Sequence, residues 1–151
     1  HRGEGGGKLS IAAAEAIAKV NPGLTFCFVS GEGTDSTENA RTMWGRVKGK
    51  TENQLLGMRL NGYMFRPGYI QPLKGVRSKT KLYQALYTFL SPFYPLFKRL
   101  APDHVTTTEN VGLAMVEVAL NGYPKRVLEN RDINALAGST QLTSDSSNPA
   151  Q

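Results

Sequence analysis

The pattern of apolar and polar positions predicts a chain of alternating helices and short strands. Some segments repeat apolar residues every three or four positions, which is the period of a helix with one buried face. Others are short continuous apolar runs, as buried strands are. The predicted helices span 9–20, 40–58, 82–90 and 108–120, the predicted strands span 24–29, 63–66 and 126–129, and a last helical turn spans 132–137.

Local signals mark where these elements begin and end. Asn21-Pro22-Gly23 ends the first helix, and Asp35 or Ser36 is expected to cap the second. Thr106-x-x-Glu109 is a capping box that opens the helix at 108–120. Strand, helix and strand follow one another within about forty residues, which is the length of a crossover unit and implies parallel strands. The sequence therefore predicts an α/β fold.

The two ends of the chain carry no such periodicity. Gly5-Gly6-Gly7 has a high backbone entropy, so residues 1–10 are expected to be disordered. Residues 139–151 are rich in Ser, Thr and Asn and are expected to form a disordered tail. The predicted domain therefore covers residues 11–138.

The charge of the chain is placed unevenly along it. The net charge is +6, and the segment 53–102 contains no acidic residue, eight basic residues and nine of the thirteen aromatic residues. Such a segment favours an anionic partner: a nucleotide phosphate, a lipid headgroup or a nucleic acid. Nucleic acid is the least supported, because no known binding motif accompanies the charge. The alternative is a solvated basic face over an aromatic core.

Within that segment, residues 82–97 carry no charge. The run is too short, and too interrupted by prolines, to span a membrane. It could lie at a membrane interface with Lys98 and Arg99 at the headgroups, or it could cap a pocket or pack internally, as aromatic runs usually do.

Cysteine and histidine are scarce. The single cysteine, Cys27, excludes a disulfide framework within the chain and fits a reducing compartment. The glycine-rich start has no apolar signal-peptide core. The expected location is therefore the cytoplasm, with membrane association as an alternative, and no metal site is expected from so few ligands.

Ser30 is the first candidate for chemistry, because it follows the strand at 24–29. Open parallel sheets bind ligands beyond the carboxyl ends of their strands, and a hydroxyl there can hydrogen-bond a substrate carbonyl or alcohol. Ser30 is a poor hydrolytic nucleophile, since it lacks a Gly-x-Ser-x-Gly turn and the histidines are His1 and His104. The alternative is a serine that merely ends the strand.

Trp44 and Lys48 lie four residues apart on the predicted helix 40–58 and share one face of it. A lysine there can hydrogen-bond a ribose and lower the pKa of a neighbouring acid. An indole N–H donates a hydrogen bond but does not ionise in the relevant range, so Trp44 cannot carry a proton as a tyrosine phenol does. The competing nucleotide motif at 31–36 is disfavoured, because Ser36 replaces its third glycine and the next strand ends in Arg66.

Together these residues resemble the NAD(P)-dependent epimerase/dehydratase-like branch of the short-chain dehydrogenase/reductase superfamily, in particular its small atypical nucleoside-diphosphate-sugar epimerase-like members. The resemblance covers about Ile11 to Ala137. It is carried by Phe28-Val29-Ser30-Gly31-Glu32-Gly33-Thr34-Asp35, Met43-Trp44-Gly45-Arg46-Val47-Lys48-Gly49-Lys50-Thr51-Glu52, Phe65-Arg66-Pro67-Gly68-Tyr69-Ile70 and Val105-Thr106-Thr107-Thr108-Glu109.

The resemblance implies that the chain is the C-terminal half of a Rossmann-like, doubly wound parallel sheet with a helical segment on the substrate side. In that family the phosphate-binding half precedes the serine strand, so the resemblance implies either a fragment or a protein that lacks this half. By position, Ser30 would orient the substrate, Lys48 would bind the cofactor ribose, and Trp44 would occupy the place of the proton-carrying tyrosine. The residues expected to line the nicotinamide end of the cleft are Arg66, Pro67, Gly68, Tyr69 and Ile70.

The expected function is that of an NAD(P)-binding, epimerase/dehydratase-like protein with a small-molecule or nucleotide-sugar substrate. Its turnover would depend on a proton carrier other than Trp44. The alternative is a non-catalytic Rossmann-derived module that uses the segment 53–102 to contact a membrane or a protein partner.

Overall fold

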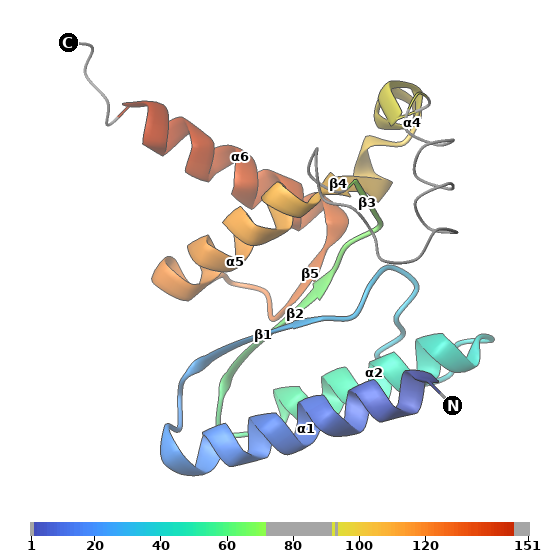
Figure 1. The fold of residues 1–151 in the computed structure, drawn as a ribbon, viewed down its shortest axis with the longest axis vertical. Coiled ribbons are helices and arrows are strands. Elements are labelled where there is room, and N and C mark those ends of the chain that lie inside the picture. Colours follow the sequence, from blue (N-terminus) through green and yellow to red (C-terminus); the bar gives the residue numbers. More distant parts are fainter. Residues whose placement is uncertain (1, 72–91, 93, 147–151) are drawn as a thin grey trace.

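The computed structural model describes residues 2–71, 92 and 94–146, and it places a small parallel sheet between two layers of helices (Figure 1). The described elements are α1 (Arg2–Val20), β1 (Thr25–Val29), α2 (Met43–Leu56), β2 (Asn61–Arg66), β3 (Tyr69–Gln71), α4 (Tyr94–Leu100), the 3-10 helix η2 (Pro102–His104), β4 (Val105–Thr107), α5 (Thr108–Asn121), β5 (Val127–Glu129) and α6 (Asn130–Ser146).

The main sheet has the strand order β1-β2-β5, and both of its pairings are parallel. β2 is the central strand, so β1 and β5 form the edges of the sheet. β3 and β4 make a separate parallel pair in which Tyr69 lies opposite Val105. The helices α1 and α2 cover one face of the sheet, and α5 and α6 cover the other (Figure 1). The prediction of an α/β fold with parallel strands is confirmed.

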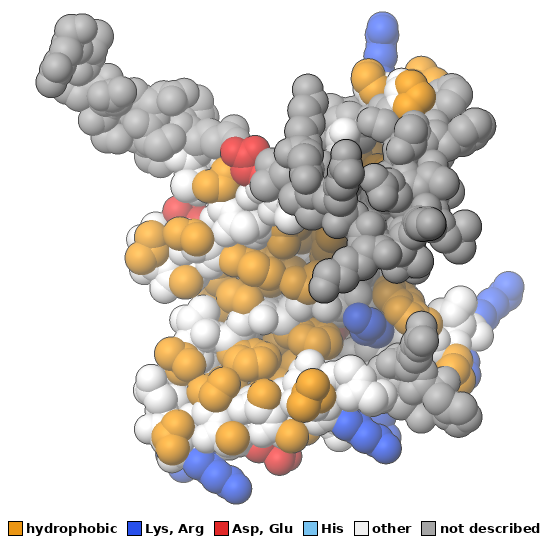
Figure 2. Space-filling model, viewed as in Figure 1, with side chains coloured by type: hydrophobic (Ala, Val, Ile, Leu, Met, Phe, Trp, Pro, Cys, Tyr) orange, Lys and Arg blue, Asp and Glu red, His pale blue; other side chains and the backbone are white. Residues whose placement is uncertain are grey.

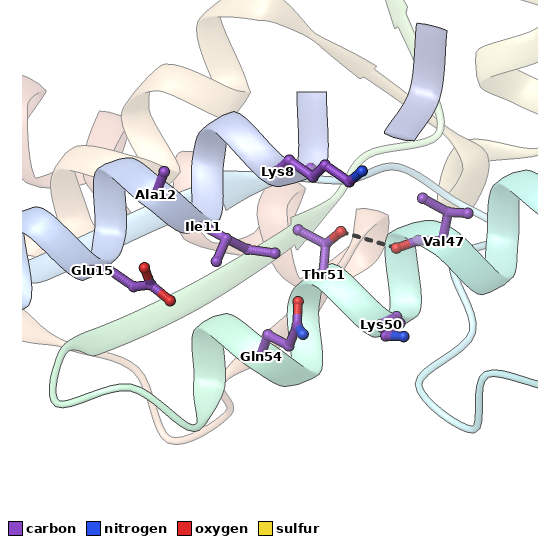
Figure 3. Close-up of a pocket in the computed structure, with 9 residues that line it drawn as sticks. Lys8, Ile11, Ala12, Glu15, Val47, Lys50, Thr51 and Gln54 are labelled. Carbon is purple, nitrogen blue, oxygen red and sulfur yellow. Dashed lines mark hydrogen bonds between the residues drawn. The ribbon is translucent and has the colours of Figure 1, made fainter. Parts of the chain in front are cut away.

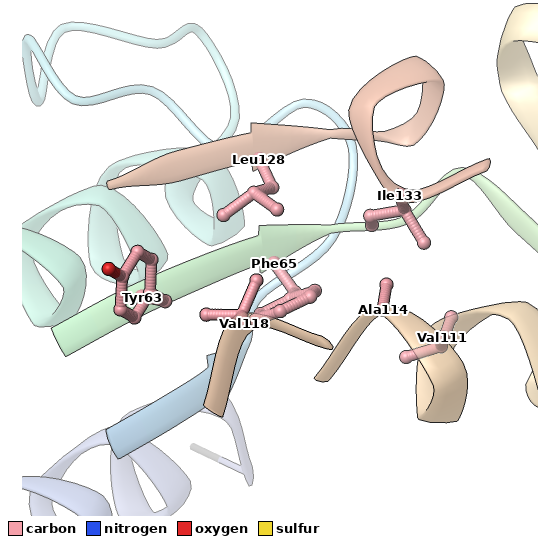
Figure 4. Close-up of a cluster of buried hydrophobic side chains, with 7 residues drawn as sticks. All are labelled: Tyr63, Phe65, Val111, Ala114, Val118, Leu128 and Ile133. Atoms are coloured by element: carbon pink, nitrogen blue, oxygen red, sulfur yellow. The ribbon is translucent and has the colours of Figure 1, made fainter. Parts of the chain in front are cut away.

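The alternation of side chains along β2 divides the core into two clusters. Met64 points toward α1 and α2, where it packs with Ala14 and Leu55. Tyr63 and Phe65 point toward α5 and α6, because successive residues of a strand face opposite sides. The cluster on that side is drawn in Figure 4 and comprises Tyr63, Phe65, Val111, Ala114, Val118, Leu128 and Ile133.

The first helix is longer than the sequence pattern predicts. It begins at Arg2, so the expectation that residues 1–10 are disordered is wrong for residues 2–10. The glycines that suggested disorder allow a close helix contact: a side chain at buried Gly7 would lie 2.7 Å from Thr51 Oγ1 on α2. Packing against α2 thus outweighs the low helix propensity of glycine.

The C-terminal helix is also longer than the sequence predicts. α6 continues to Ser146, so the predicted tail at 139–151 is helical through 146. The helix is held by packing against α5, since Ile133 and Ala137 are buried and the Thr140 hydroxyl donates to Glu117 on α5. Tertiary contacts again decide the structure of a segment whose composition is polar.

Two helix caps are also corrected. The N-cap of α5 is Thr107, the last residue of β4, and not Thr106; its hydroxyl accepts from the Asn110 N–H at 3.1 Å. The N-cap of α2 is Thr42, whereas Asp35 closes a turn by accepting from the N–H groups of Thr37 and Asn39.

Part of the basic and aromatic segment lies outside the described residues. The predicted helix 82–90 and most of the uncharged run 82–97 fall there, so the predictions of a membrane contact or a pocket cap at this segment stay predictions. Among the described helices, none combines the length and the apolar character that crossing a membrane requires.

Candidate functional site

Polar side chains gather where the three strands of the main sheet end. Ser30 follows β1, Arg66 is the last residue of β2, and Glu129 is the last residue of β5, where the register places it opposite Arg66. Glu52 reaches the same point from α2, the helix that connects β1 to β2. The carboxyl ends of parallel strands are where α/β sheets bind their ligands, so these polar side chains form a candidate site.

Glu52 and Arg66 form the centre of this cluster. Glu52 is fully buried, and its carboxylate accepts from Arg66 Nε at 3.1 and 3.2 Å and from Nη2 at 2.5 Å. The other donors of Arg66 reach Glu129 at 3.0 Å and the Ser36 hydroxyl at 2.6 Å. Burial disfavours the charged guanidinium, but the bonds and charges of Glu52 and Glu129 outweigh it and raise the pKa of Arg66.

Ser30 is part of the same buried network. Its side chain is almost fully covered, and its hydroxyl lies 2.5 Å from Glu52 Oε1 and 3.2 Å from the Phe65 carbonyl oxygen. A hydroxyl has one hydrogen to donate, and here both acceptors in reach belong to the protein. Ser30 therefore fixes Glu52 and the end of β1, and its donor is not directed at a ligand.

Trp44 and Lys48 lie together on the first two turns of α2. Lys48 Nζ is 5.7 Å from the centroid of the Trp44 ring and 5.7 Å from that of Phe28 on β1, within reach of a cation–π attraction. Burial lowers the pKa of the Lys48 ammonium, and the negative charge of Glu52 partly opposes this. Lys48 is thus a half-buried cation close to two aromatic rings.

These side chains line a cavity of about 450 Å³. The lining residues come from the start of α1, from β1 and from α2, and they are Gly6, Gly7, Ser10, Phe28, Trp44, Val47, Lys48 and Thr51. The volume is in the range of sites that take small molecules or cofactors. The hydroxyls of Ser10 and Thr51 donate to the carbonyl oxygens of Gly6 and Val47. The cavity therefore offers a ligand aromatic stacking surfaces and the Lys48 amine as a hydrogen-bond donor.

Glycines allow α2 to approach the loop that follows β1. A side chain at Gly45 would lie 2.7 Å from the Gly33 carbonyl oxygen, and one at Gly49 would overlap the carbonyl group of Asp35. The Trp44 ring covers Gly31 and Gly33, both of which have positive φ angles, at 120° and 83°. In the sequence Trp-Gly-x-x-Lys-Gly, the two glycines have no side chains that would keep α2 away from the loop. The close approach of α2 positions the Trp44 ring and the Lys48 amine.

The predicted cleft wall from Arg66 to Ile70 has several different roles in the structure. Arg66 is tied to Glu52, and the carbonyl oxygen of buried Pro67 accepts from the Glu32 N–H at 2.9 Å. The Gly68 N–H donates to Asn130 at 2.9 Å. Tyr69 and Ile70 form β3. These residues connect the main sheet to the β3–β4 pair, and none of them lines the Lys48 cavity.

Sequence reasoning missed Glu52, Glu129 and Asn130. Glu52 had a usable signal: it follows Lys48 by one helical turn and stands beside the buried stripe of α2, where an acidic residue needs a partner. Asn130 had the same signal as Ser30, since it directly follows a short strand, and Glu129 is the last residue of that strand. The partners of Glu52 are distant in sequence, so no local pattern could identify them.

A second hollow, of about 490 Å³, runs between α1 and α2 (Figure 3). It carries Lys8 and Glu15 from α1 and Lys50 and Gln54 from α2, and the Thr51 hydroxyl donates to the Val47 carbonyl oxygen at 2.9 Å. Gly7, Val47 and Thr51 line both hollows, so this second hollow joins the Lys48 cavity.

Figure 2 shows apolar side chains gathered over α1 and α5 on the face viewed there.

No protein-family model, curated protein or solved structure matches the chain. Within residues 2–71 and 94–146, no group of three His, Cys, Asp or Glu side chains is arranged to hold a metal ion. The site must therefore be judged from its own geometry.

Proposed function

We propose that this chain is an NAD(P)-binding, epimerase/dehydratase-like module of the short-chain dehydrogenase/reductase type. The observation that carries the proposal is the position of Lys48. Its amine lies 5.7 Å from the ring centroids of both Trp44 and Phe28, beside a cavity of about 450 Å³ near the carboxyl end of a parallel strand. Open α/β sheets generally bind their ligands beyond the carboxyl ends of the strands, which supports the proposal.

The residues present suit the ribose and nicotinamide part of such a cofactor. An ammonium donates hydrogen bonds and accepts none, which fits the vicinal hydroxyls and ring oxygen of a ribose. The aromatic faces of Trp44 and Phe28 offer stacking surfaces to a planar ring. When bound, the dinucleotide would supply the hydride chemistry, while Lys48 binds and orients it.

The role of Glu52 follows from its neighbours. Its charge raises the tendency of Lys48 to stay protonated, while its hydrogen bonds to Ser30 and Arg66 keep the carboxylate fixed. Ser30 therefore acts in this proposal as a support for Glu52 and α2. The substrate would be a polyhydroxylated compound such as a nucleotide sugar, and the proton of its reacting hydroxyl must go to a group other than Trp44.

Trp44 is the single tryptophan of the chain and is 43 % exposed, so its emission reports directly on this cavity. NADH and NADPH are titrated into the folded protein, and energy transfer from Trp44 to the reduced nicotinamide is measured. Saturable quenching in the wild type, lost in Lys48→Met and kept in Lys50→Met, is the expected result. Lys50 is the matched control, because it lies two residues further along α2 and lines the hollow between α1 and α2, not the Lys48 cavity.

An absence of quenching in a sample whose circular dichroism shows the folded state would contradict the proposal. Equal quenching in Lys48→Met and the wild type would place the cofactor elsewhere and would remove the role assigned to Lys48.

A further inference from the structure

The surroundings of Lys48 differ from those of the other lysines whose side chains the structure describes. Lys48 is partly buried, whereas the others are exposed on the surface. The exposed lysines are Lys8, Lys19, Lys50 and Lys125. Within the described residues, the Lys48 amine makes no hydrogen bond and no ion pair, and it lies 5.7 Å from the ring centroids of Phe28 and Trp44. Neither ring offers an atom that accepts a conventional hydrogen bond.

These surroundings favour the neutral form of the amine. An ammonium carries three hydrogens, and each of them needs an acceptor once it is withdrawn from water. Burial therefore lowers the pKa of Lys48, and the negative charge of Glu52 opposes this only in part. The Glu52 carboxylate is itself bound to Ser30 and Arg66. The fraction of neutral amine near neutral pH is thus larger than in a solvated lysine, and the neutral amine has the lone pair that attacks an electrophile.

The cavity beside this amine is mostly apolar. Its volume is about 450 Å³, and Phe28, Trp44 and Val47 supply its apolar walls. The hydroxyls of Ser10 and Thr51 also line it, but both donate to backbone carbonyl oxygens. Aromatic walls attract planar rings by stacking. The cavity therefore suits a planar, largely apolar molecule whose reactive group can meet the amine.

Two other nucleophilic side chains in the described part of the chain are less suited to attack a carbonyl. Burial raises the pKa of the Cys27 thiol, so little reactive thiolate is present. His104 contacts Glu32 through Nδ1 in a separate pocket of about 230 Å³. A ring nitrogen of histidine has no second hydrogen to lose, so it cannot form a double bond to a carbonyl carbon. A primary amine such as that of Lys48 can.

We propose that Lys48 forms an imine with an aromatic aldehyde that stacks on Trp44 in this cavity. The lone pair of the amine attacks the carbonyl carbon, a C–N bond forms, and the π electron pair of the carbonyl moves to its oxygen. Transfer of one proton from nitrogen to that oxygen gives a carbinolamine. The hydroxyl then leaves as water with the second amine proton, and a carbon–nitrogen double bond remains. One amine and one aldehyde give one imine and one water, so the step needs no oxidant or reductant.

This chemistry is a second use of the cavity and does not rest on the proposed function. Lys48 binds a ribose as an ammonium, whereas it attacks an aldehyde as a neutral amine. The two ligands would occupy the same space, so each excludes the other. Imine formation is therefore measured without dinucleotide, and a failure of NADH quenching does not alter its result.

Reductive trapping of the imine tests the proposal on the folded chain. Benzaldehyde is added near neutral pH with sodium cyanoborohydride, which reduces an imine to a stable amine, and peptide mass spectrometry locates the label. Lys48 should be labelled severalfold faster than Lys50, which lies on the same helix, is exposed and does not line the cavity. The preference should shrink at high pH, where lysine amines in general become neutral, and it should vanish in urea.

A second aldehyde and two variants test the role of the aromatic wall. Acetaldehyde has the same reactive group without a ring, so its preference for Lys48 over Lys50 should be smaller. Trp44→Phe keeps an aromatic face and should keep the preference for benzaldehyde, whereas Trp44→Leu should lose most of it. Circular dichroism verifies that both variants are folded.

The labelling ratio of Lys48 to Lys50 decides the outcome. Equal labelling by benzaldehyde in the folded wild type would overturn the proposal, because the amine would then not be activated. The same ratio with acetaldehyde as with benzaldehyde would show that the cavity does not select a ring. An unchanged ratio in folded Trp44→Leu would show that the aldehyde does not stack at this position.

Discussion

Arg66 Nη2 lies 2.5 Å from Glu52 Oε2, and the carboxylate that accepts this bond is wholly buried. The two residues are fourteen positions apart and come from β2 and α2. Removing one partner of such a pair leaves an uncompensated buried charge, whereas replacing both with apolar groups leaves none. Glu52 and Arg66 are therefore expected to be strongly coupled energetically.

This coupling predicts the outcome of a double-mutant cycle. Glu52→Leu should lower the free energy of unfolding by about 3–5 kcal/mol. Adding Arg66→Met to it should cost little more, or recover part of the loss. Denaturant unfolding measures both quantities, and Glu15→Leu, at an exposed position of α1, should be close to neutral. Additive losses would mean that the pair does not interact in solution.

Gly49 and Gly112 predict opposite effects of the same substitution. Gly49→Ala should destabilise the fold by about 1–3 kcal/mol or more, because the added methyl would overlap the carbonyl of Asp35. Gly112→Ala meets nothing within 4 Å on α5 and should stabilise by up to about 1 kcal/mol through helix propensity alone. Thermal unfolding of the two variants compares them directly. A tolerated Gly49→Ala would show that α2 does not lie against the loop.

Lys48 predicts a pH-dependent difference between the wild type and Lys48→Met. Its pKa in the folded protein is below the ordinary value of 10.5 because of burial, so the unfolded chain binds a proton more readily. The stability contributed by Lys48 therefore rises with pH through the window just below 10.5, and the cost of burying its charge applies at lower pH. The stability advantage of Lys48→Met should shrink as the pH rises through that window.

Lys48→Met should also abolish NADH quenching. Stability and cofactor binding are followed by separate measurements on this variant. A stability difference that is constant with pH would contradict the half-buried environment of Lys48.

Asp132 predicts an effect at acid pH. It accepts from Lys125 Nζ at 2.9 Å, from the Glu129 N–H at 3.1 Å and from the Tyr123 hydroxyl at 3.3 Å. Burial would raise the pKa of its carboxyl, but these bonds outweigh it and hold the pKa below the ordinary value of 3.8. The stability it contributes is present above 3.8 and is lost as the pH falls through the folded pKa.

Asp132→Asn should therefore be less stable than the wild type near neutral pH, and the gap should close in acid. Urea unfolding between neutral and acid pH measures this. A gap that widens in acid would place the carboxyl outside this network.

Trp44→Tyr tests whether the helix position retains its expected chemistry. A phenol one turn before Lys48 can ionise, so hydride transfer should increase over the wild type. An equal or lower rate in this variant, with stability maintained, would show that the position cannot support proton transfer.

The sequence predicted the order of elements well where the apolar period was clear. β1, β2, α2 and α5 are found close to their expected places, because each buries its own apolar face. It failed at the ends of α1 and α6, where glycine or polar composition suggested disorder and contact with a neighbouring helix decided otherwise. β3 and β4 were missed because Tyr69–Gln71 and Val105–Thr107 are short and contain polar residues, so they do not stand out as apolar runs.

The candidate site was also predictable from the sequence only in part. Trp44 and Lys48 share a face of one helix, so their proximity could be predicted from spacing. The bond from Ser30 to Glu52 and the contact from Glu32 to His104 join segments 22 and 72 residues apart. Such contacts are set by the strand register and the loop path, which a single sequence does not encode locally.

The position of β1 at the edge of its sheet also determines how the protein will behave as a sample. Thr25–Val29 contains no proline and no charged residue, and within the described chain its outer backbone groups pair with no strand. Any extended peptide can add to such an edge, and the apolar side chains over α1 and α5 flank it (Figure 2). Dilution should favour the monomer. Concentrating the protein should convert it into assemblies rich in intermolecular strands. The shelf life of a preparation should therefore depend on its concentration more than on its melting temperature.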